Sequence, residues 1–284
     1  MIKILRTVVE HVADKPITGY AGYESGYKKD FTLWNLESDA SAGWEITSPI
    51  LSGIDGYLEA AKVFEVLDKE ISRLGLDVNF KTGTHVHLGW KPQSLVELKR
   101  FLRLVRLAEP GLGTLVAPSR LADFNGKNYD LEEPNMYCKP ISYVATEAHI
   151  RSWKSLADVE ESLTDRHVTF NLRPLFKQGT VEVRMHSGTV EARKIMPFVS
   201  LIQQSIWAAS IDRIIPKTED RFTIIPDGDI VEFARAYLPS ENEPNQAAFL
   251  RRLDARRREI LELWRQSSKL CTWTEFRQNW KPVA

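Results

Sequence analysis

The sequence predicts an α+β fold, in which an antiparallel sheet carries helices on one face and polar side chains on the other. Several short segments alternate apolar and polar residues with period two, as half-buried strands do, and longer segments with helical spacing separate them. The clearest alternation lies in residues 179–191, GTVEVRMHSGTVE. Its apolar residues are expected on one face, and Glu182, Arg184 and His186 on the other.

Two interpretations of this strand stay open. The charged face can be the solvated edge of a sheet with a cross-strand ion pair, because charged alternation is common on half-exposed sheets. It can also bind a charged ligand, since a carboxylate, a guanidinium and an imidazole in one row suit such a ligand.

The composition narrows the class of protein. With 284 residues and 43% hydrophobic content, the chain can bury the core of one large domain or two small ones. Lys and Arg balance Asp and Glu at 38 each, so small-molecule or peptide partners are favoured over nucleic acid. Cys138 and Cys271 lack CxxC spacing, which argues against a disulfide scaffold or a cysteine zinc site. No apolar run approaches a membrane span, so we expect a cytoplasmic protein.

In the N-terminal part, two strands and a long helix are the main expected elements. Residues 31–38 and 43–50 alternate as strands joined by a turn, and Glu45 lies on the opposite face from Trp44. Apolar residues at helical spacing over 55–74, followed by Gly75, predict the helix. The other expected segments are a helix over 3–14, a loop or irregular hairpin over 17–30 and a strand over 76–80.

The central part is expected to add one strand, one helix and a long loop. Residues 82–90, TGTHVHLGW, predict a strand on which His85 and His87 share a face. Residues 94–112 predict an amphipathic helix. Residues 118–143 lack a regular pattern, and so long a loop in a compact domain is usually functional or mobile.

The C-terminal part begins with a further strand. Residues 169–176, TFNLRPLF, are expected to place Asn171 and Arg173 on one face of that strand. After the strand at 179–191, residues 192–214 predict a long apolar helix. The tail from about residue 217 is expected to be a helical appendage or a lid, with helices near 231–238 and 249–266.

The polar strand faces carry the candidate functional residues. Carboxylates with imidazoles suit a divalent metal, and arginines suit phosphate or carboxylate, so together they indicate metal-dependent phosphoryl chemistry. Structural alternatives exist for each: the His pair as surface residues, Glu45 as a solvated carboxylate, Arg173 as an ion-pair member and Asp39 as a turn former. The residues expected on one sheet face are Glu45, His85, His87, Asn171, Arg173, Glu182, Arg184 and His186.

Six segments between Tyr20 and Ala209 form an ordered series: FTLWNLESDAS, GWEITSPILSG, TGTHVHLGW, NMYCKPI, HVTFNLRPLF and GTVEVRMHSGTVEARKI. This series resembles the amidoligase family, whose relatives are glutamine synthetase and glutamate–cysteine ligase. The resemblance implies the curved antiparallel sheet of the glutamine synthetase catalytic domain, over residues 1–215, with a helical extension over 216–284. It implies a reaction in which ATP phosphorylates a carboxylate and an amine attacks the acyl phosphate, giving an amide or isopeptide bond.

The same resemblance implies the metal ligands. Glu45 of GWEITSP matches a glutamate that binds magnesium, and Asp39 occupies the acidic position before it. His85 matches the metal-binding histidine, and Glu182 resembles the glutamate on a second metal ion. The implied cofactors are ATP and magnesium, with manganese as an alternative ion.

The resemblance also implies the groups that bind the nucleotide. His87 would lie beside the phosphates, and Arg184 would steady the transferred phosphoryl group. Arg173 and Arg120 are looser matches, suited to phosphate or to a substrate carboxylate. The implied catalytic residues are Arg184, Arg173 and Glu45.

One departure from the family leaves three functions open. Family members usually begin with a GxExE strand whose glutamates complete both metal sites, and that motif is missing. The chain can be a carboxylate–amine ligase that acts on a peptide, protein or cell-wall-type substrate, a metal-dependent hydrolase, or a non-catalytic binding member of the family. An open sheet edge near residues 31–48 would favour the last, because the family's first strand pairs there.

Overall fold

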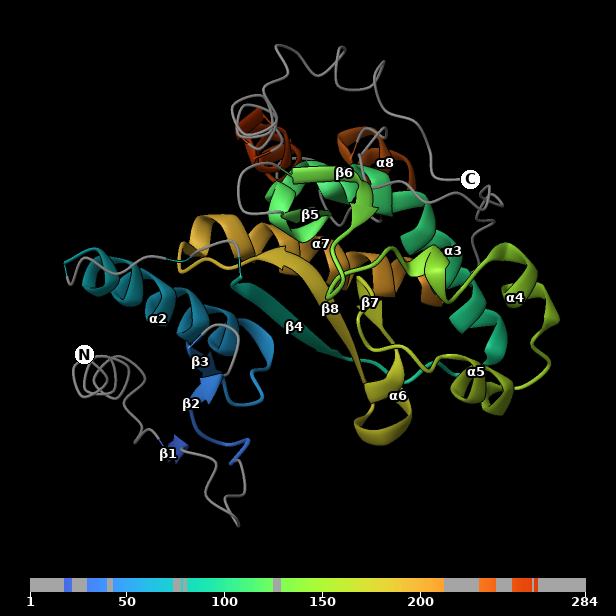
Figure 1. The fold of residues 1–284 in the computed structure, drawn as a ribbon, viewed down its shortest axis with the longest axis horizontal. Coiled ribbons are helices and arrows are strands. Elements are labelled where there is room, and N and C mark those ends of the chain that lie inside the picture. The colour runs from blue at the N-terminus through green and yellow to red at the C-terminus, as the bar shows by residue number, and fades with distance from the viewer. Residues whose placement is uncertain are drawn as a thin grey trace. The chain divides into compact units, whose positions relative to one another are not determined.

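The structure is a computed structural model that describes residues 18–21, 30–39, 43–73, 78, 81–124, 129–211, 230–238, 247–256 and 258–259. The chain divides into two compact units. The first comprises Met1–Thr82 with Gly188–Met196, and the second Gly83–Ser187 with Pro197–Ala284. Helices combined with small, mainly antiparallel sheets (Figure 1) are compatible with the predicted α+β class.

The sheet of the first unit has the strand order β1-β2-β3. β2 (Asn35–Asp39) and β3 (Gly43–Thr47) are antiparallel, as predicted, and β1 (Thr18–Ala21) runs parallel to β2. β1 therefore occupies the edge of β2 that we considered as open, and its sequence TGYA contains no carboxylate.

The helix α2 (Gly53–Arg73) packs on the apolar face of this sheet. Trp44 and Ile46 of β3 contact the buried cluster, whereas Glu45 is exposed, which confirms the predicted alternation of faces. The buried members of the cluster are Trp34, Leu36, Val63 and Leu67.

The sheet of the second unit has the order β4-β8-β7 and is antiparallel throughout. β4 (Gly83–Gly89) and β8 (Thr180–Ser187) form its long pair, and β7 (Phe170–Asn171) adds a short edge. Its apolar side chains join the large core that also contains residues of α3 (Leu95–Leu112) and of α7 (Ala192–Ser210). The helix predicted over 94–112 is thus confirmed, and the helix predicted over 192–214 is confirmed for residues 192–210.

Two segments differ from their predicted form. Residues 118–143 contain regular structure: the 3-10 helices η2 (Pro118–Arg120) and η3 (Ile141–Tyr143) and the pair β5 (Ala122–Phe124) and β6 (Tyr129–Pro134).

The predicted strand over 169–176 is wrong beyond Asn171, because α6 (Arg173–Gln178) follows β7. Pro174 lies in the first turn of α6, where its fixed φ favours a helix. Arg173 is therefore a helical residue and does not share a strand face with Asn171. The remaining short helices of this unit are η1 (Gly113–Leu115), α4 (Glu147–Ser152) and α5 (Leu156–Ser162).

The C-terminal helices belong to the core of the second unit. α8 (Ile230–Tyr237) contributes buried Ile230 and Phe233, and Leu253 of the helical residues 247–256 is also buried. At Gly111 of α3 a Cβ atom would lie 3.1 Å from the backbone nitrogen of Ile230, so the two helices approach closely.

Some predicted elements lie outside the described residues. These are the helix over 3–14, most of the strand over 76–80, the end of the helix over 249–266 and the domain boundary near residue 216. Within the described ranges, no helix combines the length and apolar character needed to cross a membrane.

Candidate functional site

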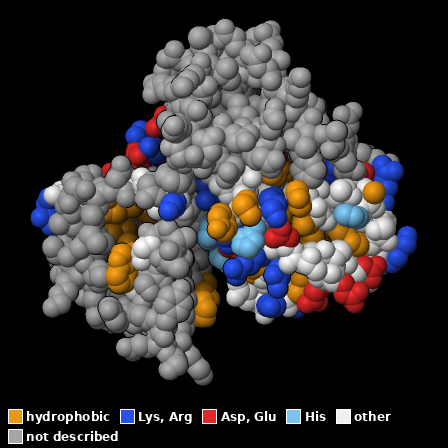
Figure 2. All heavy atoms as spheres, in the orientation of Figure 1, with side chains coloured by type: hydrophobic (Ala, Val, Ile, Leu, Met, Phe, Trp, Pro, Cys, Tyr) orange, Lys and Arg blue, Asp and Glu red, His pale blue; other side chains and the backbone are white. Residues whose placement is uncertain are grey.

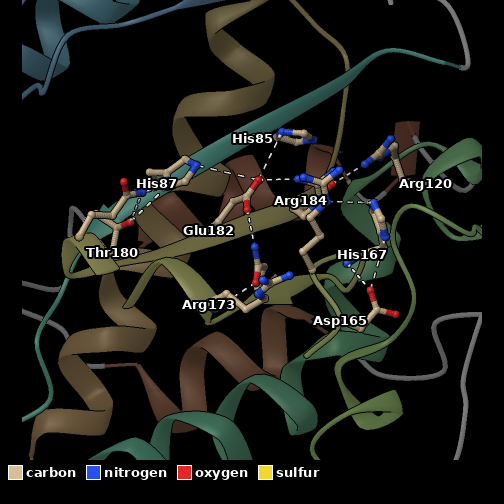
Figure 3. A network of polar contacts seen from close by, with 12 residues as sticks. His85, His87, Arg120, Asp165, His167, Arg173, Thr180, Glu182 and Arg184 are labelled. Atoms are coloured by element: carbon tan, nitrogen blue, oxygen red, sulfur yellow. Dashed lines mark hydrogen bonds and ion pairs between the residues drawn. The ribbon is translucent and has the colours of Figure 1, made fainter. Parts of the chain in front are cut away.

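The polar face of the β4–β8 pair brings two histidines to one carboxylate. His87 lies directly opposite Glu182 in the strand register, so the two side chains share a face. The Glu182 Oε1 atom lies 3.5 Å from Nδ1 of His85 and 3.9 Å from Nε2 of His87 (Figure 3). The predicted grouping of these three residues is confirmed.

A β-bulge interrupts the pair next to this cluster. Val86 lies opposite Val183, but Thr84 lies opposite His186, so Arg184 and Met185 together face the single residue His85. The extra residue turns His186 to the apolar side, where it is fully buried with its ring 4.8 Å from that of Phe198. The expectation that His186 lies on the polar face is wrong for this reason.

Both oxygens of the Glu182 carboxylate accept short hydrogen bonds. Nη1 of Arg184 donates to Oε1 at 2.6 Å, and Nδ2 of the buried Asn171 donates to Oε2 at 2.7 Å. The backbone N–H of Arg184 donates to the carbonyl oxygen of Thr169 at 2.8 Å, which holds β8 against the segment leading into β7. Glu182 therefore fixes the guanidinium of Arg184 on this face.

A second guanidinium lies beside the first. Arg120 of η2 is only 4% exposed, and its Nη2 donates to the backbone oxygen of Arg184 at 2.6 Å. It packs over Gly83, where a Cβ atom would lie 2.9 Å from the guanidinium carbon. The spacing of residues along the chain does not predict that Arg120 lies beside Arg184, because the two meet only in the folded chain.

Each of the two arginines has a buried Nε–H donor. The Nε atoms of Arg120 and Arg184 are buried and have no hydrogen-bond partner among the residues that the structure describes. A buried donor without an acceptor costs about 1–3 kcal/mol. The positive charge and the terminal N–H groups of the two guanidinium groups suit a phosphate or a carboxylate.

The charges of this cluster are set by the arginines. Burial, and then the positive charge of Arg184, lower the pKa of His85 to about 4, so its imidazole is neutral at neutral pH. Burial raises the pKa of Glu182, but the Arg184 charge and the Asn171 hydrogen bond more than offset this, and the pKa lies below its usual value. The face thus carries an ionised carboxylate and two guanidinium groups. Figure 2 shows histidine, cationic and acidic side chains gathered at one place on the surface.

The other two predicted nucleotide residues have local partners. Nδ1 of His87 lies 3.2 Å from Oγ1 of Thr180 and 3.4 Å from Nε2 of Gln178. Arg173 is exposed, and its Nη1 donates to the carbonyl oxygen of Thr164 at 3.2 Å. No contact of its side chain with Glu182 or Arg184 is among those described.

The described residues of this cluster supply only part of the coordination that a magnesium ion requires. No group of three or more His, Cys, Asp or Glu side chains is placed there to hold a metal ion. Magnesium requires near-octahedral oxygen coordination, whereas Glu182 is the one carboxylate of this cluster and Arg184 already binds its Oε1. The described residues therefore do not by themselves complete a magnesium site.

The predicted ligands Glu45 and Asp39 belong to the first unit. Glu45 lies directly opposite Glu37 in the β2–β3 register, and the backbone of Asp39 lies opposite Gly43. The sequence interpretation missed Glu37, although the period-two spacing from Asp39 could have identified it.

Two further residues were missed in the second unit. Asn171, although expected on the polar face, was not identified as the partner that orients Glu182. His167 was not identified either, and it lies beside Arg184 in Figure 3. Neither role has a signal in the spacing of residues along the chain.

Comparison with known proteins gives one family. The model of the family described as "Putative amidoligase enzyme" matches residues 12–206. Neither a curated protein nor a solved structure matches the chain significantly.

Proposed function

Because the chain belongs to the amidoligase family, whose model covers more than half of it, we propose that it is an ATP- and magnesium-dependent carboxylate–amine ligase. The reaction would form an acyl phosphate on a substrate carboxylate and then an amide or isopeptide bond with an amine. A peptide, a protein or a cell-wall component is the expected class of substrate.

One observation carries the proposal: the guanidinium groups of Arg120 and Arg184 lie side by side, next to the ionised Glu182. Phosphoryl transfer develops negative charge on the transferred group and on the leaving phosphate, and fixed guanidinium groups stabilise it. Arg184 is held on one side by Glu182, and Arg120 holds the backbone of Arg184. This rigidity favours transfer because little reorganisation remains at the moment of reaction.

His85 and His87 have separate parts in this proposal. The neutral imidazole of His85 can act as a ligand or as a hydrogen-bond partner, because it is not protonated at neutral pH. His87, with its Nδ1 beside Thr180, can turn Nε2 toward a phosphate oxygen. The predicted ligands of magnesium or manganese stay Glu45, Asp39, His85 and Glu182. Arg173 stays a predicted phosphate contact, and the curved sheet of glutamine synthetase type stays the predicted fold.

Calorimetric titration with a non-hydrolysable ATP analogue, with and without magnesium, tests the nucleotide part. The native chain should bind, and Arg184→Gln should lower the affinity by roughly 10- to 100-fold, as expected for charge-assisted hydrogen bonds. Arg151→Gln is the matched control, since Arg151 is an exposed residue of the same unit that pairs with Glu147. Native protein that does not bind the analogue would point to a non-catalytic member of the family.

The reaction itself is tested by ADP formation. ADP should appear only when a carboxylate and an amine are both supplied with ATP. Metal analysis of the purified protein provides the contrast: tightly held zinc without nucleotide affinity would support a hydrolase instead.

A further inference from the structure

An amide-forming site needs a group that accepts a proton from the attacking amine. Glu182 is poorly suited, since both of its oxygens accept short hydrogen bonds. His85 is a predicted metal ligand, and its Nδ1 lies 3.5 Å from the same carboxylate. The proton acceptor has to be sought beside this pair.

His167 has the structural features of such a base. It lies beside Arg184 in Figure 3, on the segment between α5 and β7, and its side chain is 33% exposed, so a substrate can reach it. Its backbone N–H donates to Oδ1 of Asp165 at 2.8 Å, and its Nδ1 lies 3.5 Å from the same oxygen. A carboxylate on Nδ1 favours the tautomer with its proton there, which leaves the lone pair on Nε2.

Asp165 is itself held in place. Lys139 donates to its Oδ2 at 2.8 Å, and although burial raises the pKa of Asp165, this hydrogen bond and that from the His167 backbone keep it low. The ring of Tyr137 stands edge-on to the imidazole, with centroids 5.7 Å apart. The imidazole orientation is therefore fixed from two sides.

The charges around His167 keep it in its basic form. Burial and the positive charges of Arg166 and Arg184 lower the pKa of His167. The negative charge of Asp165 raises it, and the positive charge of Lys139 lowers it slightly further. Nε of the exposed Arg166 donates to Nε2 of His167 at 3.3 Å, a long contact that an amine can replace. Nε2 is thus an acceptor in the free protein.

We propose that His167, oriented by Asp165, is the general base for the amine in the ligase reaction, an assignment that rests on the proposed function. The amine nitrogen forms a bond to the acyl carbon with its lone pair, and the bond from that carbon to the phosphate oxygen breaks, its electron pair leaving with phosphate. The proton that the nitrogen no longer holds passes to Nε2 of His167. Asp165 stabilises the imidazolium, and the nearby cations promote its return of the proton to water.

The test compares two nucleophiles in the native chain and in His167→Gln. With ATP, magnesium and a panel of amino-acid and peptide carboxylates, the variant should form amide from an alkylamine about 10²- to 10⁴-fold more slowly. Hydroxylamine is a weaker base, so the cationic nitrogen formed by its attack loses a proton to water unaided, and hydroxamate formation should change little. His149→Gln is the matched control, an exposed histidine of the same unit with its Nδ1 on the Val144 carbonyl oxygen.

The pH profile separates a base from a structural residue. The native alkylamine rate should fall as the pH decreases through the lowered pKa of His167, because the imidazole becomes protonated, and the variant should lack this limb. ¹⁵N-labelled histidine should show His167 with its proton on Nδ1 in the resting protein. Full alkylamine activity in His167→Gln, or a proton on Nε2, would overturn the assignment alone. A native chain that forms no ADP would overturn the proposed function and the base with it.

Discussion

The β2–β3 and β4–β8 strand pairs both carry carboxylates on their polar face, but the carboxylates meet different neighbours. In β2–β3 the register is unbroken, and Glu45 lies opposite a second carboxylate, Glu37. In β4–β8 a bulge interrupts the register, and Glu182 lies opposite His87 and binds Arg184. Alternation along one strand therefore identifies the polar face, whereas the chemistry of that face depends on the residues of the neighbouring strand.

The largest expected difference concerns removal of each carboxylate. Glu182→Ala leaves Arg184 without its partner in a mostly buried position, so the free energy of unfolding should fall by about 3–5 kcal/mol. Glu45→Ala, at an exposed position, should change it by less than about 0.5 kcal/mol. Urea unfolding measures both, and equal losses would show that the two carboxylates are equivalent.

The free energy of unfolding is expected to depend on pH through a buried carboxylate of the second unit. Glu109 of α3 accepts hydrogen bonds from Oγ1 of Thr169 and, at 2.8 Å, from the backbone N–H of Ile141. Burial raises its pKa to about 7 from 4.5, so its contribution to stability is complete below pH 4.5 and is lost as the pH rises to about 7.

This shift corresponds to roughly 3 kcal/mol between the two ends of that range. Urea unfolding across the range should show a smaller decline in Glu109→Gln than in the native chain. Glu65→Gln, at an exposed site in the first unit, serves as control and should retain the native decline. An unchanged decline in Glu109→Gln would contradict the assignment.

A smaller effect is expected from the contact that fixes Arg120. In Gly83→Ala the new methyl group would meet the guanidinium at 2.9 Å, which should cost about 1–3 kcal/mol and weaken binding of the ATP analogue. Gly89→Ala in the same strand has no atom within 4 Å of the new group, so it should be near neutral. Thermal unfolding and calorimetry of the two variants decide the matter; similar losses in both would rule out the Arg120 contact as the cause.

The smallest effect concerns the carboxylate pair of the first unit. Glu45→Gln removes one of two like charges placed directly opposite each other, so in EDTA it should stabilise the protein slightly, by less than about 0.5 kcal/mol. Magnesium should stabilise the native chain but not the variant if Glu45 is a metal ligand. Thermal unfolding in EDTA and in magnesium tests both statements, and an identical response to magnesium would remove Glu45 from the predicted ligands.

Local periodicity was enough to predict much of the fold. The helices α2 and α3 follow from the spacing of apolar residues, and the faces of β3 and β4 follow from alternation, which placed Glu45, His85 and His87 correctly. These features depend on residues close together in the chain, so the sequence can specify them.

Features that depend on distant partners could not be predicted in this way. His186 is buried because β8 gains one residue against β4, almost a hundred positions earlier in the chain, and alternation along β8 alone cannot show this. Arg120 reaches the site from a segment without periodic pattern. Arg173 was misplaced for a different reason, since the helix-favouring effect of Pro174 outweighed the strand pattern.

The close approach of α8 to α3 limits how this chain can be shortened for expression. Gly111 leaves room for the backbone of Ile230, and Phe233, Ala234 and Leu238 are buried with the same core as the β4–β8 sheet. A fragment that ended at residue 215 would leave this apolar surface open to water and would be prone to aggregate. A minimal fragment for crystallisation should therefore extend beyond Leu238.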